Sequence, residues 1–229
     1  MRYQKILSNL DITKDGLVAY VKENSKKNEV VFLKQGDADR ACGLYCALMS
    51  LIICGAISRN DIITQEDKNL RKFLKEFKDF TPLIREGTTA KKIADAIENT
   101  FNHEVSCTRT LAKNDKLLKI IKNQISIDNP FILGILWESK NGENQGGHWV
   151  LVTGVEYENL EGGSLEDTDS KITKIFVLDS LGDIPKYTYW NRIILVEEDM
   201  KYKWLTRTGN KKGYEPITLD HGIVVEDKT

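Results

Sequence analysis

Cys42 and Gly43 lie at a point in the sequence that suits nucleophilic chemistry. They occur in the stretch KQGDADRACGLYC, where polar residues give way to a long apolar segment. The start of a helix offers unpaired N–H groups and the positive end of the helix dipole, and both lower the pKa of a thiol. A neighbouring glycine lets a substrate backbone approach closely. The sequence therefore predicts that Cys42 is a nucleophile and Gly43 a substrate contact; the alternative is a small apolar residue at the start of a buried helix.

His148 is the histidine best placed to act as the base for this thiol. The chain has three histidines, at positions 103, 148 and 221. His148 follows the glycine-rich stretch GENQGG and opens the apolar stretch WVLVTGV, so a strand would fix it and a cleft would leave it reachable. Its neighbours Gly147 and Trp149 are interpreted as further substrate contacts. The alternative for His148 is a hydrogen-bonded surface histidine at the start of a strand.

Asp179 supplies a carboxylate that would orient the histidine. It ends the apolar stretch KIFVLDS. If residues 149–155 and 175–178 form neighbouring antiparallel strands, the start of the first strand lies beside the end of the second. That pairing would bring His148 and Asp179 together, as a Cys-His-Asp triad requires. The alternative for Asp179 is a turn-forming residue.

Gln35 is the candidate donor of an oxyanion hole. It lies seven positions before Cys42. A side-chain amide there, together with the backbone N–H of Cys42, could hold a developing oxyanion. Alone, Gln35 would be interpreted as a polar loop residue. A glutamine, a cysteine at a helix start, a histidine at a strand start and an aspartate at a strand end, in that order, are much less expected by chance.

The remaining cysteines indicate no further chemistry. Cys46 and Cys54 lie on the same apolar segment as Cys42 and are interpreted as inert core residues. No C-x-x-C pair occurs, so the cysteine spacing matches no zinc motif. We therefore expect reduced thiols, no metal ion and no cofactor.

The elements that must position these residues change in character along the chain. The apolar pattern predicts helices in the first half and strands from residue 130 onward. The expected helices are at 3–9, 44–57, 61–100 with interruptions, and 117–124. The expected strands are at 16–21, 29–33, 103–108, 130–138, 148–158, 171–180, 191–199 and 219–227.

This order predicts an α+β fold class and a single two-lobed domain over residues 1–229. About residues 1–128 would form a mainly helical lobe, and about residues 129–229 a mainly β lobe. The central helix that carries Cys42 would pack on an antiparallel sheet of the second lobe. A cleft between the lobes would be the natural place for a site.

At these positions the sequence resembles the papain-like cysteine peptidase superfamily, and most closely the bacterial double-glycine leader peptidases that process bacteriocins. The resemblance rests on Gln35, Cys42-Gly43, His148 in GGHWVLVTGV and Asp179 in FVLDSLGD. These pieces span roughly two thirds of the chain. The resemblance implies a papain-like two-lobed fold, with a triad of Cys42, His148 and Asp179 and an oxyanion hole at Gln35.

The sequence departs from this family at two positions. Ala41 stands before the cysteine where these peptidases usually have Asp, and Ser180 follows the aspartate where they usually have Pro. HWVLV, LDSLGD and ACGLYC are also similar to the motifs of ubiquitin-like-protein-specific proteases. In that family the His and Asp precede the Cys, whereas the order here is the papain order.

The function implied is that of a thiol peptidase that cleaves peptide or isopeptide bonds through a thioester acyl-enzyme. One alternative is an amidase, a deamidase or a transglutaminase-like acyl transferase on the same fold. Another is a binding module without activity. A protein or peptide partner is expected in each case, and the sequence does not indicate an oligomeric state.

Composition and charge exclude other classes of partner. The chain has 33 Lys and Arg against 34 Asp and Glu, so its formal net charge of -1 favours neither a nucleic acid nor a membrane surface. The N-terminus has no apolar signal segment, and the longest apolar run is too short to span a membrane. A cytoplasmic location is expected, and export without a signal is left open.

Two polar loops complete the predictions. The loop Glu138–Gly147 lies beside His148 and is expected to act as a lid. The acidic loop Glu161–Asp169 is interpreted as a solvated hairpin loop, with contact to a partner as the alternative.

Overall fold

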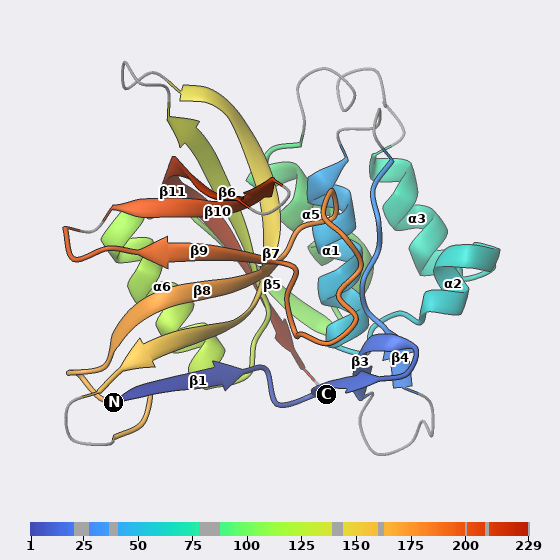
Figure 1. Ribbon diagram of the computed structural model, residues 1–229. Coiled ribbons are helices and arrows are strands. Elements are labelled where there is room, and N and C mark those ends of the chain that lie inside the picture. The colour runs from blue at the N-terminus through green and yellow to red at the C-terminus, as the bar shows by residue number, and fades with distance from the viewer. Residues whose placement is uncertain are drawn as a thin grey trace.

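The fold is described from a computed structural model of the chain (Figure 1). The structure describes residues 1–20, 28–36, 41–77, 88–138, 144–159, 163–199, 201–208 and 211–228. The two loops expected at 138–147 and 161–169 lie partly outside these residues.

Six antiparallel strands close into a barrel, which is the main element of the fold (Figure 1). Around the barrel the order is β7-β6-β11-β10-β9-β8, and β8 pairs with β7 to close the ring. β1 extends the sheet beyond β7, and β5 pairs with β11. The strands are β1 (Arg2–Ile6), β5 (Val105–Thr110), β6 (Phe131–Glu138), β7 (Asn144–Glu158), β8 (Lys171–Leu178), β9 (Arg192–Val196), β10 (Tyr202–Thr208) and β11 (Lys211–Asp227).

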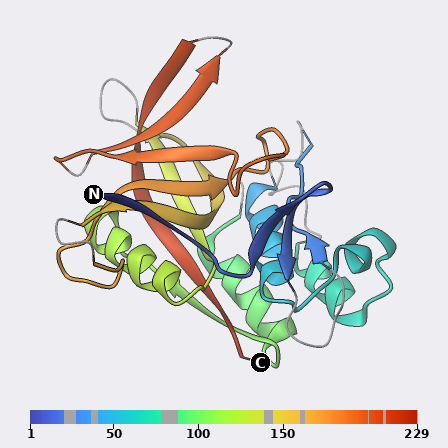
Figure 2. The same cartoon turned by 60° about the horizontal axis from the view of Figure 1, so that its bottom comes forward.

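Five helices and a small second sheet surround the barrel in the described part of the chain. The second sheet has the order β2-β3-β4. In Figure 2, α6 lies along the barrel apart from α1, α3 and α5, which gather on another side. The bounds are β2 (Leu10–Thr13), β3 (Gly16–Tyr20), β4 (Asn28–Val30), α1 (Cys42–Ile53), α2 (Arg59–Thr64), α3 (Lys68–Glu76), α5 (Ala90–Phe101) and α6 (Asn114–Ser126).

α1 is the buried helix that its apolar sequence predicts. Every residue from Cys42 to Ile53 except Tyr45 is buried, and the helix packs mainly on β7. The polar Ser50 inside it donates a hydrogen bond to the carbonyl of Ala47 at 2.8 Å, which satisfies its hydroxyl within the helix. A helix without a polar face needs apolar neighbours on every side, so α1 is held firmly at the centre of the molecule.

β7 is buried on both of its faces. Residues 148–157 are all buried because one face lines the barrel and the other meets α1. The continuous apolar run WVLVTGV, without polar alternation, reflects this double burial. The element that carries His148 therefore has almost no freedom to shift.

The predicted fold class was wrong. The described residues are mostly β, and the C-terminal half forms a closed barrel rather than a sheet on which a helical lobe packs. Residues 1–128 also contribute strands β1 to β5. The helical lobe was overestimated because β1 follows a helical pattern and the four-residue strand β2 is too short to show a period.

The first segment shows this error most clearly. Apolar residues at 3, 6, 7 and 10 follow the i, i+3, i+4, i+7 pattern of a helix. The structure instead has strand β1, which pairs with β7 from Arg2↔Glu158 to Ile6↔Gly154. β6 pairs with β7 only as far as Val152, so the same edge of β7 has backbone groups without a β6 partner from Gly154 onward. Satisfying these groups outweighs a weak local preference for a helix.

No helix in the described ranges is long and apolar enough to cross a membrane.

Candidate active site

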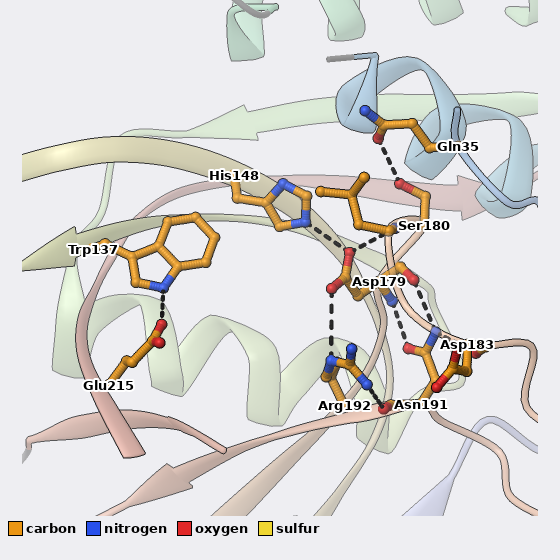
Figure 3. A network of polar contacts seen from close by, with 10 residues as sticks. Gln35, Trp137, His148, Asp179, Ser180, Asp183, Asn191, Arg192 and Glu215 are labelled. Carbon is orange, nitrogen blue, oxygen red and sulfur yellow. Dashed lines mark hydrogen bonds and ion pairs between the residues drawn. The ribbon is translucent and has the colours of Figure 1, made fainter. Parts of the chain in front are cut away.

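β7 and β8 bring His148 and Asp179 together at one end of the barrel. The two strands pair antiparallel up to Leu151↔Leu178, so the residues just before and just after this pair meet. The predicted pairing of these strands is confirmed. His148 Nε2 donates to Asp179 Oδ1 at 2.8 Å, and the two residues are only 7% and 5% exposed (Figure 3).

Cys42 lies on the other side of the His148 ring. It is the first residue of α1, and its thiol forms a hydrogen bond with the His148 side chain. Because Nε2 is engaged with Asp179, the ring nitrogen that faces the sulfur is Nδ1. The backbone N–H groups of Gly43 and Trp149 also donate to the sulfur. The arrangement is thus Cys42–His148–Asp179, with the imidazole between the thiol and the carboxylate.

The surroundings of Cys42 favour a thiolate. Burial alone would raise the pKa of the Cys42 thiol, but the hydrogen bond and charge of His148 and the two backbone N–H groups together lower it below its ordinary value. Cys42 as a residue is 8% exposed.

His148 and Asp179 show the complementary shifts. Burial alone would lower the pKa of His148, but its hydrogen bonds to Asp179 and Cys42 raise it to about 9. Burial would raise the pKa of Asp179, but the His148 hydrogen bond, the Leu181 N–H and the Arg192 charge lower it overall. At neutral pH these directions favour a thiolate–imidazolium pair beside an ionised carboxylate.

The Asp179 carboxylate is held by three groups. Oδ1 accepts from His148 and from the backbone N–H of Leu181 at 3.0 Å. Oδ2 lies 3.8 Å from Nε of Arg192, the first residue of β9. Because each oxygen has a partner, the carboxylate plane is fixed relative to the imidazole.

Gln35 is buried and is positioned by Ser180, a residue that sequence analysis had noted only as a departure from the family pattern. The Gln35 N–H donates to the Ser180 carbonyl at 2.9 Å, and the Ser180 hydroxyl donates to Gln35 Oε1 at 2.9 Å (Figure 3). These bonds leave the NH₂ of the Gln35 amide on the side away from Ser180. The donor that an oxyanion hole needs is therefore oriented by the residue next to Asp179.

Gly43 and Trp149 fill space behind the thiol. A Cβ at Gly43 would lie 2.8 Å from Cδ1 of Ile93 and 3.0 Å from Cδ1 of Trp149, so a larger residue there would force these side chains to shift. The Trp149 indole is buried, and its Nε1 donates to the Thr88 carbonyl at 2.7 Å. Both residues are thus packed into the core, and the group that Trp149 presents to the thiol is its backbone N–H.

Gly147 is exposed next to His148 on β7. A role for Gly43, Gly147 or Trp149 in substrate binding stays a prediction. The lid expected at Glu138–Gly147 also stays a prediction, because residues 139–143 lie outside the described part and Asn144 already begins β7.

Trp137 is a further neighbour of His148 that sequence analysis missed. Its ring centroid lies 5.5 Å from that of His148, and its Nε1 donates to Glu215 at 3.0 Å. Ile135 pairs with His148 across β6 and β7, so Trp137, two residues along β6, lies on the same face. Side chains alternate between the two faces of a strand, so the register of β6 against β7 would have been enough to predict this contact.

The other thiols differ sharply from Cys42. Cys46 is fully buried, and burial raises its pKa well above the ordinary value. Burial also raises the pKa of Cys107 to about 12. Among the described residues no disulfide is present, and no group of three or more His, Cys, Asp or Glu side chains gathers as metal ligands would. Cys42 is thus distinguished from Cys46 and Cys107 by its hydrogen bond to an imidazole.

Comparison with known proteins adds no assignment, since no protein-family model and no curated protein matches the chain.

Proposed function

We propose that the protein is a thiol peptidase that cleaves peptide or isopeptide bonds. The observation that carries the proposal is the buried hydrogen bond between His148 and Asp179, together with the Cys42 thiol at the start of α1, whose pKa the His148 ring lowers. A structural cysteine needs no imidazole, and a structural imidazole needs no thiolate, so their combination with a buried carboxylate favours nucleophilic catalysis.

The mechanism begins with the thiolate–imidazolium pair. Cys42 Sγ attacks the carbonyl carbon of the scissile amide and forms a tetrahedral intermediate whose oxygen carries the negative charge. His148 then gives its Nδ1 proton to the leaving amine as the C–N bond breaks, which leaves a thioester on Cys42. Water, deprotonated by His148, attacks the thioester, and the acid product leaves as the thiolate returns.

The developing oxyanion needs donors that are already in place. The Gln35 amide, held by Ser180, is one such donor. Gln35 is buried, so its hydrogen bond to the oxyanion would be strong in the low-dielectric site. Because the donor is already oriented, it need not reorient as the negative charge develops. The backbone N–H of Cys42, at the start of α1, is the second donor that we propose.

Two further features agree with this proposal. The chain order Gln, Cys, His, Asp is the order of the papain-like superfamily that the sequence resembles. Reduced cysteines suit a reducing compartment, and we therefore propose action on a polypeptide in the cytoplasm.

The first experiment measures how fast iodoacetamide alkylates each cysteine between pH 4 and pH 10, with peptide mass spectrometry as the readout. We expect Cys42 to label rapidly at pH about 6, where an ordinary thiol is almost fully protonated. Cys46, which is fully buried, should stay unlabelled in the folded protein. Cys107, whose pKa is raised to about 12, should label far more slowly than Cys42 at pH 6. The two thiols are therefore internal controls. A Cys42 profile like that of a free thiol would contradict the proposed function.

The second experiment looks for the reaction itself. The wild type is incubated with a proteome-derived peptide mixture, and new termini are identified by mass spectrometry. We expect cleavages that vanish in Cys42→Ala and persist in Cys46→Ala, which changes a buried thiol on the same helix. Deamidated or crosslinked products in place of new termini would instead indicate an amidase or a transferase.

A further inference from the structure

The segment between β8 and β9 carries two contacts of the site, and one side chain bonds the start of this segment to its end. Asp179 is its first residue and Ser180 its second, while Asn191 lies at its far end. In Figures 1 and 2 this segment lies beside α1, and the Gln35 N–H bonded to the Ser180 carbonyl ties it to the chain that leads into α1.

Asn191 makes a two-point contact with the peptide groups of Asp179. Its Oδ1 accepts from the Asp179 N–H at 2.8 Å, and its Nδ2 donates to the Asp179 carbonyl at 2.8 Å (Figure 3). The same NH₂ group donates to the Asp183 carbonyl at 2.9 Å. The side-chain amide thus acts as a partner strand would, at the point where β8 has ended.

The turn around Asp179 is shaped to accept this amide. The Gly182 N–H donates to the Asp179 carbonyl at 2.9 Å and closes a turn over Ser180 and Leu181. A Cβ at Gly182 would lie 2.6 Å from Nδ2 of Asn191, so a larger residue would push the amide away. Asn191 and Gly182 therefore fit each other as a pair.

We propose that Asn191 is a positioning residue of the active site. By clamping the peptide groups of Asp179, it holds the Asp179 carboxylate against His148 and the adjacent Ser180 against Gln35. One amide then fixes both the group that orients the imidazole and the group that orients the oxyanion donor. This inference rests on the proposed function.

Residues 189–191, at the end of the segment, make other contacts. We therefore expect the segment to keep its position when the Asn191 side-chain amide is removed. The Trp190 ring stacks on Phe176 with centroids 3.8 Å apart, and the Tyr189 carbonyl accepts from the Thr153 hydroxyl at 2.9 Å. The Asn191 N–H, which remains in any variant, donates to the Val177 carbonyl at 3.1 Å. Asn191→Ala therefore removes the clamp and keeps the neighbouring contacts.

The test compares Asn191→Ala and Gly182→Ala with the control Asn129→Ala. Asn129 donates its amide to Gln124 at 2.9 Å just before β6, at the end of that strand away from His148. Each variant is alkylated with iodoacetamide across pH, and labelling of Cys46 reports loss of the folded state. We expect Asn191→Ala to shift the Cys42 profile to higher pH by about one unit, which is about tenfold slower labelling at pH 6. Gly182→Ala should shift it less, and Asn129→Ala not at all.

The possible outcomes separate this inference from the proposed function. An unchanged Cys42 profile in both Asn191→Ala and Gly182→Ala would overturn the role of Asn191 while the triad stands. Exposure of Cys46 in Asn191→Ala would also overturn it, because the amide would then support the whole fold. A wild-type Cys42 that labels like a free thiol would contradict the proposed function itself.

Discussion

Two histidine–aspartate pairs lie among the described residues, and they differ in nearly everything except their chemistry. His148 and Asp179 come from different strands, and their side chains are only 6% and 7% exposed. His221 and Asp220 are adjacent on β11, and their side chains are 26% and 14% exposed. The pairing of β7 with β8 in the barrel brings His148 and Asp179 together, whereas Asp220 and His221 are neighbours in the sequence.

The partners on either side of each pair differ as well. His148 has the Cys42 thiol on its second nitrogen, whereas the His221 ring packs edge-on against the Trp149 indole at 4.7 Å. Beyond its histidine, Asp179 lies 3.8 Å from Arg192, whereas Asp220 is bonded to Lys113 at 2.6 Å. The comparison teaches that a histidine–aspartate pair indicates catalysis only when burial and a nucleophile accompany it.

The largest expected effect separates the two histidines. His148→Ala removes the imidazolium that stabilises the thiolate, so we expect Cys42 alkylation at pH 6 to fall about 100-fold. His221→Ala removes the bond to Asp220 and the packing contact with Trp149, and it should change the rate less than about twofold. Alkylation rates and melting temperatures of both variants measure this. Equal losses in the two variants would remove the distinction on which the triad rests.

A smaller effect is expected for the two carboxylates. Asp179→Asn keeps an acceptor for His148 but removes the negative charge, so peptide turnover should fall about tenfold. The Cys42 alkylation profile should shift to higher pH at least as far as in Asn191→Ala, because the imidazolium that stabilises the thiolate loses its carboxylate. Asp220→Asn should leave turnover unchanged. Steady-state kinetics on a peptide identified in the cleavage screen would test this, and a greater loss from Asp220→Asn would reverse the assignment.

The pH dependence sharpens the role of His148 as an acid. Burial alone would lower the pKa of His148. The hydrogen bonds to Asp179 and Cys42 outweigh burial and raise this pKa to about 9. The imidazolium loses its proton as the pH rises through this value, so turnover should fall about tenfold per unit above it. Alkylation needs only the thiolate and should not fall. The pH profiles of turnover and of Cys42 alkylation, measured on the same protein, test this role. A decline of both rates above pH 9 would indicate unfolding instead.

The smallest expected effect concerns the two cations. Arg192→Gln frees Asp179 from a competing charge, so the carboxylate should hold the imidazolium more strongly and raise the pKa of His148. The shift should be about 0.3 unit, because Arg192 is part-exposed and screened by solvent. Lys113→Gln should leave that pKa unchanged. Titration of the His148 ring protons by NMR measures both, and a downward shift in Arg192→Gln would contradict the assigned geometry.

Part of the fold was predictable from local sequence. The strands β6, β7, β8 and β9 and the helix α1 were expected close to their observed positions because their apolar runs are long and bounded by polar turns. Strand β10 was missed, and β1 was taken for a helix. Closure of the barrel was not predictable, since it depends on β8 pairing with both β7 and β9. Such pairings come from hydrogen bonds between distant segments, which leave no local period.

The sequence by itself determined which residue types could do chemistry: one thiol at a helix start, one imidazole at a strand start and one carboxylate at a strand end. Alternation and strand direction were enough to pair His148 with Asp179, because antiparallel geometry leaves few choices. Only the tertiary structure decided the supporting contacts. Ser180 is bonded to Gln35 across 145 positions, and Asn191, the residue before β9, is bonded to the peptide groups of Asp179. Burial and orientation are properties of the packed whole, so no local pattern encodes them.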